Sequence, residues 1–576
     1  GGDGGSGEDS QPENNPSEEE LGERVPELVL EYPSDYGPWQ DLVPMVMSDI
    51  EDALDHPVTA EPKGISAFLE DVYSDQRTFH FSMWGMQTPP VRLDPYNLMA
   101  DFTIEKAGPN GLPNYPSYVD CEYSTLVHEA QTEGNQDERT QMFQNAMSVY
   151  SNDVVTVPFV DRSGYIAGRN DMMDWGPEGD LGFDLWNVGF FAGTSPQEGD
   201  RWVYGTGTDF AERTNHFAIS GLPDQPPWSL MLNSPLVIFD ENREMQPVLA
   251  SDYTIEENST RYVFDIRDSQ FHNGEPVTAE AVKWTFEMIE ANTDSIAQAN
   301  AQNYSSIETP DDSTVVFTFE EPNPSFLTTH IPQWGILHPG TWEGMDSVSD
   351  FNPSVDSYVG SGPFEMEGFT QGETLTLGPF DGHGYYSPQS TVVLQVITDN
   401  SAKLRAFRQG EVMVVDALSG TELTTLAEQV GEDAVTQSIT EGTANWMMHA
   451  SYPRAPVRFN PFVDAVGKTI NREEINQVLY AGLSEPQMDS MYFNDGLPAY
   501  PEDGEGLHTF TDDPSGDPDA ARQALTDAGW GWDGDSNLRY PADTDTSPLY
   551  PQGEMPSAEE FACIDANGEY VPEDQR

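Results

Sequence analysis

Oxygen-bearing side chains at alternate positions near the C-terminus are a candidate for metal chemistry. Asp533, Asp535 and Asn537 have the spacing of the first ligands in a calcium-binding loop. Such a loop also has a glycine at its sixth position and a glutamate at its twelfth, where this chain has Leu538 and Thr544. The run therefore favours a plain Asp/Asn turn, with a structural calcium ion as the alternative. The sequence indicates no other cofactor.

The sequence lacks the enzyme motifs that residue spacing can reveal. His128-Glu129 has no second histidine at the spacing of a H-E-x-x-H zinc site, and Gly360-Ser-Gly-Pro363 has a proline where a nucleophile elbow starts its helix. No P-loop and no G-x-G-x-x-G motif follows a strand pattern. A cysteine nucleophile would be Cys121 or Cys563, and neither has a histidine beside it. We therefore expect a protein that binds without catalysis.

Alternating strand and helix patterns flank a middle part, 200–319, in which strands dominate. Strands are expected at 28–32, 78–84 and 392–397, and helices at 42–54, 139–150, 279–291, 402–408, 472–480 and 519–527. Helices that alternate with strands predict α/β layers. At ~100–200 residues per domain, the length predicts two to four domains.

The charge of the chain excludes several classes of protein. Its 576 residues include 100 Asp and Glu against 24 Lys and Arg, a formal net charge of −76. Such a field repels phosphate, which excludes binding to nucleic acid or to anionic membranes. No stretch approaches ~18 consecutive apolar residues, so we expect no membrane-spanning segment. The excess of carboxylates with few lysines resembles proteins of salt-loving archaea; the alternative is an acidic mesophile protein.

The first 25 residues read as a flexible acidic tether, with no aliphatic or aromatic side chain before Leu21. This leader resembles the segment that comes after the lipidated cysteine of haloarchaeal lipoproteins. We therefore expect a cysteine immediately before Gly1 and a lipid anchor on the outer face of the cytoplasmic membrane. The alternative is an ordinary disordered terminus. Two N-glycosylation sequons, at Asn258 and Asn303, are compatible with export to the cell surface.

A run in the middle of the chain carries the most specific pattern. It comprises Tyr262-Val-Phe-Asp-Ile-Arg267, Phe271-His-Asn-Gly-Glu-Pro276 and Thr278-Ala-Glu-Ala-Val282, which read as a strand, a tight Asn-Gly turn and the start of a helix. The run resembles the signature of family 5 extracellular solute-binding proteins, the dipeptide/oligopeptide/nickel class that serves ABC importers. Segments 360–364, 399–416, 470–475 and 519–530 resemble further segments of that family, in the family's order.

Segments that come near the C-terminus in that family come first in this chain. Phe81–Trp84 with Leu93-Asp-Pro95 resembles the family's Trp…Asp-Pro segment, and 118–120, 138–139 and 157–159 resemble the family's next segments along the chain. Because the two parts sum to about one copy, we predict a circular permutation, in which joining Arg576 to Pro26 would restore the usual order. The alternative is a sequence assembled out of order.

The resemblance implies an α/β fold with two lobes around a hinge, of the type II periplasmic-binding-protein class with an extra subdomain, here circularly permuted. The expected division is 1–25 tether, 26–155 first part of lobe II, 156–228 hinge and core strands of lobe I, 229–358 extra subdomain of lobe I, 359–395 remaining core of lobe I and hinge, and 396–576 second part of lobe II. In this division Cys121 and Cys563 both fall in lobe II, where they form either a disulfide or two free buried thiols.

In the family the ligand lies between the lobes, against aromatic walls and a few polar groups. The resemblance implies these candidate ligand-binding residues: Trp84, Gln87, Asn215, His216, Trp334, Asn445, Trp446 and His449. For the tryptophans the alternative is core packing, and for the histidines a surface or core position. In peptide binders of the family an aspartate about three residues after the tryptophan anchors the α-amine. Here neutral Gln87 stands in that stretch and cannot form a charge-assisted bond.

The resemblance implies a monomeric cell-surface receptor that captures a peptide or similar small solute and delivers it to ABC permease subunits. A sugar or oligosaccharide receptor of the same fold is the first alternative, since the candidate site is rich in tryptophan and lacks the amine-anchoring acid. The others are a secreted enzyme built on the fold and a surface structural protein.

The net charge makes a prediction about salt. We expect the melting temperature to rise steeply from dilute buffer to molar KCl, because molar salt shortens the screening length to ~3 Å and so weakens the repulsion between carboxylates. Thermal unfolding followed by circular dichroism over a KCl series checks this. A melting temperature that does not change with salt contradicts it.

Overall fold

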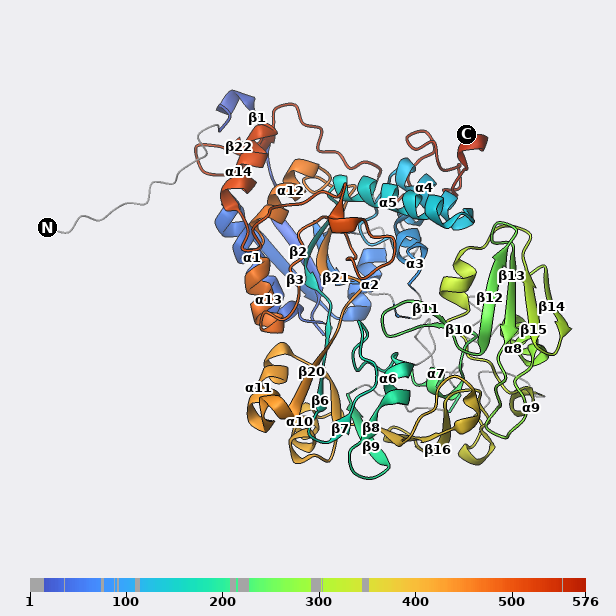
Figure 1. The fold of residues 1–576 in the computed structure, drawn as a ribbon. Coiled ribbons are helices and arrows are strands. Elements are labelled where there is room, and N and C mark those ends of the chain that lie inside the picture. The colour runs from blue at the N-terminus through green and yellow to red at the C-terminus, as the bar shows by residue number, and fades with distance from the viewer. Residues whose placement is uncertain are drawn as a thin grey trace.

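The computed structural model describes residues 15–35, 37–73, 77–86, 89–90, 93–108, 114–207, 214–215, 227–291, 302, 304–343, 352–551 and 553–576. Two large sheets organise this part of the chain into two bodies, which Figure 1 shows one above the other. We call the upper body lobe II and the lower body lobe I. The predicted mixed α/β architecture in two lobes is confirmed.

Lobe II is built on a five-stranded mixed sheet. Its strand order is β3 (Val58–Lys63), β2 (Leu28–Pro33), β4 (Phe81–Gly85), β21 (Asn445–Ala450) and β5 (Thr156–Asp161). β2 runs parallel to β3 and β4, whereas β21 runs antiparallel to both β4 and β5. Because β21 lies between two strands from the first third of the chain, distant parts of the sequence build this lobe together.

Helices cover both faces of the lobe II sheet. One face carries α1 (Trp39–Leu54), α12 (Asn460–Thr469), α13 (Arg472–Tyr480) and α14 (Pro518–Asp527), and the other carries α2 (Ile65–Tyr73), α3 (Tyr96–Met99), α4 (Cys121–Thr132) and α5 (Gln136–Asn152). Side chains of Asp120 and Asn135 accept hydrogen bonds from the first backbone N–H groups of α4 and α5. These caps fix where both helices begin.

Lobe I is built on a seven-stranded sheet. Its order is β16 (Phe364–Thr370), β17 (Thr374–Pro379), β18 (Thr391–Val396), β9 (Arg201–Thr206), β19 (Val414–Leu418), β6 (Gly164–Arg169) and β20 (Val435–Thr440). β9 runs parallel to β18 and β19, and the other pairs are antiparallel. α10 (Asn400–Gln409) and α11 (Gly420–Val430) cover one face, while α6 (Val188–Gly193) and α7 (Ser229–Leu232) pack in the core on the other.

A four-stranded antiparallel sheet extends lobe I. It contains β12 (Ala250–Glu256), β13 (Arg261–Ile266), β15 (Thr314–Thr318) and β14 (Ser306–Asp311), and α8 (Ala279–Ala291) packs on it. The π-helix η6 (Phe326–His330) comes next, with a hydrogen bond from Ile331 N–H to the Phe326 carbonyl at 3.0 Å. Smaller elements are β7 (Met173–Asp174) with β8 (Ser195–Pro196), β10 (Val237–Phe239) with β11 (Met245–Pro247), and α9 (Pro339–Trp342).

Most expected elements are confirmed, and three expected domain limits are not. The first part of lobe II does not end at residue 155, because β5 (Thr156–Asp161) pairs with β21 in the sheet of lobe II. The helices expected at 279–291 and 472–480 have those bounds, and the others differ by a few residues at their ends. Within the expected tether, β1 (Leu21–Arg24) pairs with β23 (Leu538–Pro541), which also pairs with β22 (Gly531–Trp532). The expected start of lobe II at 396 is also wrong, because β19 and β20 pair with β6 and β9 of lobe I.

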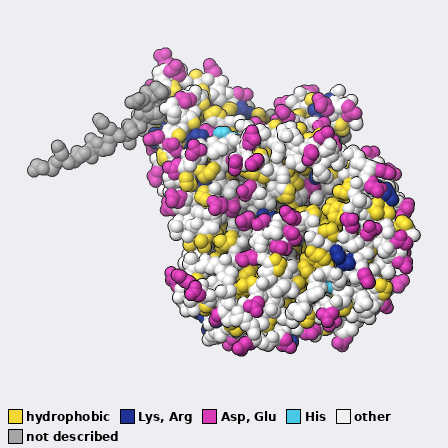
Figure 2. Space-filling model, in the orientation of Figure 1, with side chains coloured by type: hydrophobic (Ala, Val, Ile, Leu, Met, Phe, Trp, Pro, Cys, Tyr) yellow, Lys and Arg dark blue, Asp and Glu magenta, His cyan; other side chains and the backbone are white. Residues whose placement is uncertain are grey.

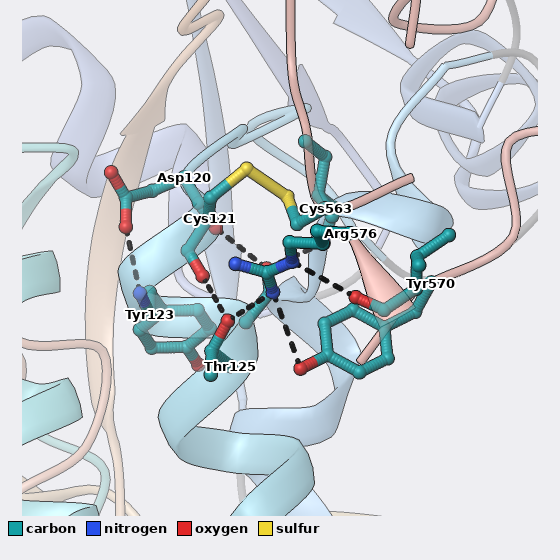
Figure 3. Close-up of a disulfide and its surroundings, with 10 residues drawn as sticks. Asp120, Cys121, Tyr123, Thr125, Cys563, Tyr570 and Arg576 are labelled. Carbon is teal, nitrogen blue, oxygen red and sulfur yellow. Dashed lines mark hydrogen bonds between the residues drawn. A yellow bond between two sulfur atoms is a disulfide. The ribbon is translucent and has the colours of Figure 1, made fainter. Parts of the chain in front are cut away.

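A disulfide fastens the C-terminal segment to lobe II. Cys121, the first residue of α4, is bonded to Cys563, with the two Cα atoms 5.5 Å apart (Figure 3). Nearby, Arg576 Nη2 donates to Thr125 Oγ1 at 2.7 Å, and the ring of Tyr570 stacks on His128 with centroids 3.9 Å apart. Of the two alternatives for the cysteines, the structure contains the disulfide.

None of the helices in the described ranges combines the length and the hydrophobicity that crossing a membrane requires. Acidic side chains are spread over the face of the molecule in Figure 2, and Lys and Arg are sparse there.

The disulfide makes a prediction about the C-terminal segment. In a Cys121→Ser/Cys563→Ser variant we expect residues 549–576 to be cleaved faster by protease and the free energy of unfolding to fall by roughly 2–4 kcal/mol, because the reduced chain regains the loop entropy that the cross-link removes. Limited proteolysis with mass mapping, in the same salt for both proteins, checks this. Equal cleavage rates for the variant and the wild type would contradict the prediction.

Candidate functional site

Within the described residues, the chain crosses from one large sheet to the other at two places. β5 of lobe II leads into β6 of lobe I through Arg162 and Ser163, and β20 leads back into β21 through residues 441–444. The two crossovers lie side by side, because the N–H of Arg162 donates to the Ala444 carbonyl at 3.0 Å. This paired connection is the geometry of a hinge between two lobes.

Aromatic rings and the guanidinium groups of Arg162 and Arg243 lie at the crossovers, and Arg243 donates to the carbonyl of Glu441. The guanidinium of Arg162 lies over the ring of Trp446, 4.5 Å from its centroid, and donates to the Gly85 carbonyl at 2.9 Å. Trp446 Nε1 in turn donates to the hydroxyl of Tyr480 at 2.7 Å. The Tyr480 ring, from lobe II, lies 5.2 Å from the ring of Tyr165 in lobe I. Trp446 therefore packs at the hinge.

The two lobes also approach closely at the start of α11. A Cβ atom at Gly420 would lie 2.2 Å from the carbonyl oxygen of Tyr480, at the end of α13. Only glycine leaves room for this contact between a helix of lobe I and a helix of lobe II.

Trp84 belongs to an aromatic wall on the other face of the lobe II sheet. It is half-buried, and its ring stacks on Phe68 at 5.5 Å and lies 5.8 Å from Tyr115. The hydroxyl of Tyr73 donates to that of Tyr115 at 3.0 Å. Trp84 immediately precedes Gly85, which Arg162 contacts, so this wall reaches the hinge. Phe68 and Tyr115 are buried, so the partly exposed ring of Trp84 is the part of this wall that can stack on a sugar ring, a peptide bond or an aromatic side chain.

His449 is a core residue. It is fully buried between Tyr115 and Phe102, and its Nδ1 is 3.0 Å from Thr156 Oγ1. Burial lowers the pKa of His449 to about 3, so the ring is neutral at physiological pH. The structure thus favours the core position over ligand contact. Trp446 and His449 point to opposite faces of β21, as the two-residue period of a strand requires.

The remaining candidates are dispersed. Asn445 is fully buried on β21, where its Nδ2 donates to the Met491 carbonyl at 3.4 Å. Trp334 is fully buried in the core of lobe I. Asn215 is buried, and its neighbour Thr214 donates to the Pro353 carbonyl at 2.6 Å. Gln87 and His216 lie outside the described residues.

An acidic pocket of about 680 Å³ opens beside the crossovers. Six carboxylates line it: Asp161, Glu441, Glu485, Asp489, Asp495 and Asp503. Burial raises the pKa of Asp161 to about 7, and neighbouring carboxylates add to this shift although Asn494 donates to Asp161 at 2.8 Å. Positive charge is favoured in this pocket and negative charge is opposed.

The run from Asp533 to Asn537 forms a turn in which the oxygen atoms of Asp533 are used within the chain. The carboxylate of Asp533 accepts hydrogen bonds from the backbone N–H groups of Asp535 and Asn537 and pairs with Arg539 at 2.9 Å. Among the described residues, no three His, Cys, Asp or Glu side chains are arranged to hold a metal ion. Asn258 is exposed at the turn between β12 and β13, as a glycosylation acceptor must be, and Asn303 lies outside the described residues.

The hinge residues Arg162, Tyr165 and Tyr480 were absent from the sequence-based candidates. A two-residue break, Arg162-Ser163, between two strand patterns was the available signal for the first crossover. The pairing of that break with residues 441–444 had no local signal.

Comparisons with known proteins find a matching family model and related sequences. The model of the "Bacterial extracellular solute-binding proteins, family 5 Middle" matches residues 244–564. A protein of Brucella ovis whose name describes ABC transporter peptide binding is 26% identical over 315 residues, which are 53% of this chain and 56% of that protein. A protein of Escherichia coli K12 named for D,D-dipeptide binding in the periplasm is 28% identical over 186 residues, 31% of this chain and 36% of that one.

Among solved structures, the oligopeptide-binding protein AppA of Bacillus subtilis in complex with a nonapeptide has 20% sequence identity and a TM-score of 0.42, covering 62% of this chain and 68% of that one. The chain spans about half the length of the Brucella relative and a smaller share of the Escherichia coli one. The family model, in contrast, matches more than half of this chain, and the chain therefore belongs to family 5 of the bacterial extracellular solute-binding proteins.

Proposed function

We propose that this protein is the extracellular solute receptor of an ABC importer, which encloses a peptide or similar small solute between its lobes and presents it to a membrane permease. The observation that carries the proposal is the paired crossover at 161–164 and 440–445, the two links between lobes I and II in the described chain. Such a connection lets two rigid bodies close on a ligand. Binding energy and closure are then linked, and the protein performs no chemistry on its solute.

Peptide is the first ligand class, because the names of the Brucella and Escherichia coli relatives describe peptide and dipeptide binding. The acidic pocket beside the hinge supports a solute with a cationic group. A sugar or oligosaccharide is the second candidate, and the partly exposed ring of Trp84, which packs on the buried rings of Phe68 and Tyr115, supports it, since sugar rings stack on aromatic surfaces.

The host, the cellular location and the oligomeric state of the protein form part of the proposal. The acidic composition supports a salt-loving host, and the leader supports a lipid anchor at the cell surface. We infer a monomeric receptor, to be checked by light scattering in molar salt. Release of the native protein from cell envelopes by detergent, and its retention in high salt alone, would support the anchor.

We also propose that the chain is a circular permutation of its family. β1 pairs with β23, so segments near the two ends of the chain lie side by side. Strands β2, β4 and β5 from the first third share a sheet with β21, which lies inside the part that the family model matches. Both features support one complete copy of the family's fold whose chain ends lie at a different place in the structure.

The permutation makes a prediction about rejoined chains. A variant that links Arg576 to Asn15 through a flexible linker, which keeps β1 and its pairing with β23, and that opens the chain between Phe190 and Trp202 should fold with the circular dichroism spectrum of the parent. Its melting temperature in molar salt should fall by only a few degrees, because most long-range contacts are kept. A second variant opened inside β21 is the control, and we expect it not to fold. An unfolded first variant contradicts the permutation.

The proposed function predicts a bound solute. Protein purified in molar salt from its native host and then denatured should release small molecules that mass spectrometry identifies. A set of peptides supports the first ligand class, and a single sugar supports the second. A protein that releases nothing, and whose melting temperature no peptide or sugar raises, contradicts a receptor function.

Trp84 gives the matching mutational test. With the solute identified in that experiment, Trp84→Ala should weaken binding roughly tenfold or more, because an aromatic wall contributes its stacking area. Calorimetric titration measures the effect. Tyr385→Ala, which removes an exposed aromatic ring of lobe I, is the control and should bind like the wild type.

A further inference from the structure

Away from the hinge, the lobes meet at a second place. There, α3 and α5 of lobe II contact η6 and the residue before it, Ser325, which belong to lobe I. In Figure 1, α3 and α4 lie beside the green four-stranded sheet that precedes η6, whereas β6 and β20, which carry the crossovers, lie toward the other side of the molecule. Contacts that lie away from a hinge are made or broken by small rotations of the lobes about it.

A buried ion pair forms the lobe II side of this contact. Arg139 Nη1 donates to Asp94 Oδ2 at 2.9 Å and Nη2 donates to Asp94 Oδ1 at 2.8 Å, which makes the pair bidentate. Both side chains are almost fully buried, at 5% and 0% exposed. Arg139 Nε donates to the Ala130 carbonyl, and the N–H of Tyr96 donates to Asp94 Oδ1. Lobe II alone therefore holds both charges in a fixed geometry.

Two hydroxyl groups of lobe I complete the ion pair. Thr328 Oγ1 donates to Asp94 Oδ2 at 2.6 Å, and Ser325 Oγ accepts from Arg139 Nη2 at 2.8 Å. The hydroxyl that faces the anion donates and the hydroxyl that faces the cation accepts, so the two groups match the polarity of the pair. A buried ion pair needs such additional bonds, because desolvation otherwise costs more than the charges gain from each other.

The electrostatics of Asp94 agree with this geometry. Burial alone would raise the pKa of Asp94, but Arg139 and the hydrogen bonds from Thr328 and Tyr96 lower it below its usual value. The carboxylate is therefore ionised at neutral pH while enclosed by both lobes.

The π-helix turns the lobe I residues toward this pair. Phe326 and His330 are buried among Tyr304 and Phe286, which anchors η6 in the core of lobe I. From the same segment, Thr328 reaches Asp94, and Thr329 Oγ1 accepts from Asn97 Nδ2 at 3.1 Å. Wide turns of this kind are frequent at functional sites.

A second contact lies beside the first. Ser259, at the turn between β12 and β13, donates from its Oγ to the Gly134 carbonyl at 3.4 Å, in the loop that joins α4 to α5. A Cβ atom at Gly134 would lie 2.4 Å from the Asn258 carbonyl oxygen, so the two loops are in close contact.

We propose that Ser325 and Thr328 of lobe I, closing onto the Asp94–Arg139 pair of lobe II, form the latch that holds the two lobes together in the solute-bound state. The proposal rests on the proposed receptor function and names the residues that set its closed geometry. When the lobes separate, water replaces both hydroxyls and the pair is solvated, so the open state keeps the ion pair but loses the latch. Asp94, Arg139, Ser325 and Thr328 are positioning residues, since they act on the solute only through closure.

The test measures the distance between the lobes. Spin labels at Asp137→Cys in α5 and Glu320→Cys after β15, both exposed positions, report this distance by pulsed electron resonance in molar salt. The label-bearing parent should show a short distance in the protein as purified. Adding Ser325→Ala and Thr328→Val should shift most of the population to longer distances. Affinity for the solute that the wild type releases should fall roughly tenfold or more, because hydrogen bonds to buried charges are lost from the closed state alone.

Three controls make the result specific. When Thr328→Ser replaces Thr328→Val in the test variant, the hydroxyl that donates to Asp94 is kept, and the short distance between the labels should return. Ser251→Ala with Thr314→Val removes one hydroxyl of each kind from the four-stranded sheet without touching lobe II, and should leave the distance unchanged. The circular dichroism and melting temperature of each variant show that it is folded.

The latch is overturned if the Ser325→Ala/Thr328→Val protein has the distance distribution of the parent, if the sheet control shifts it equally, or if the parent shows no short distance. The distances are measured whether or not a solute is found, so failure of the latch and failure of the receptor function are separate outcomes. If the distance shifts in the latch variant but the wild type releases no solute and no peptide or sugar raises its melting temperature, closure is established and the receptor function is contradicted.

Discussion

The paired crossover between the lobes is the constraint on which the rest of the structure depends. β5 and β21 are neighbours in one sheet, β6 and β20 are neighbours in the other, and the two connecting segments are hydrogen-bonded to each other. A double connection of this kind resists twisting more than a single linker does, and it leaves bending as the easy motion. Every other contact between the lobes in the described part of the chain is non-covalent, so it can form and break as the hinge bends.

Contacts around the crossover restrict the bending to the connecting segments. Arg162 is held by the Gly85 carbonyl and the ring of Trp446, so the connecting residue itself is anchored to lobe II. The close approach of Gly420 to Tyr480 limits sliding between α11 and α13, because the backbones are already in contact. Motion is thereby directed to the opposite side of the molecule, where the contacts are short polar bonds. The aromatic wall around Trp84 lies on lobe II next to this bend.

The elements of the fold could be predicted from the sequence, whereas the long-range pairings could not. Hydrophobic periodicity located α8 and α13, since amphipathic spacing is a local property. The same local pattern reads alike in either sheet, which is why β19 and β20 were assigned to the wrong lobe. The two-residue period of side chains along β21 can be predicted from the sequence, and it is enough to place Trp446 and His449 on opposite faces of the strand. Nothing local indicates that Asp94 faces Arg139, because a loop and a helix bring them together.

The acidity of the chain bears on how its lobes can close. Bringing two bodies with a shared charge of −76 together raises their mutual repulsion, and only screening by salt lowers that cost over distances beyond a few ångströms. A contact made of free carboxylates would add to the repulsion. The Asp94–Arg139 pair carries no net charge as a unit, and the partners that lobe I offers it are neutral hydroxyls. Closure at this point therefore gains short-range hydrogen bonds, which salt screens little, without adding charge to the interface. In concentrated salt a neutral, directional contact of this kind keeps its strength, whereas long-range attraction between charged lobes would be screened as their repulsion is.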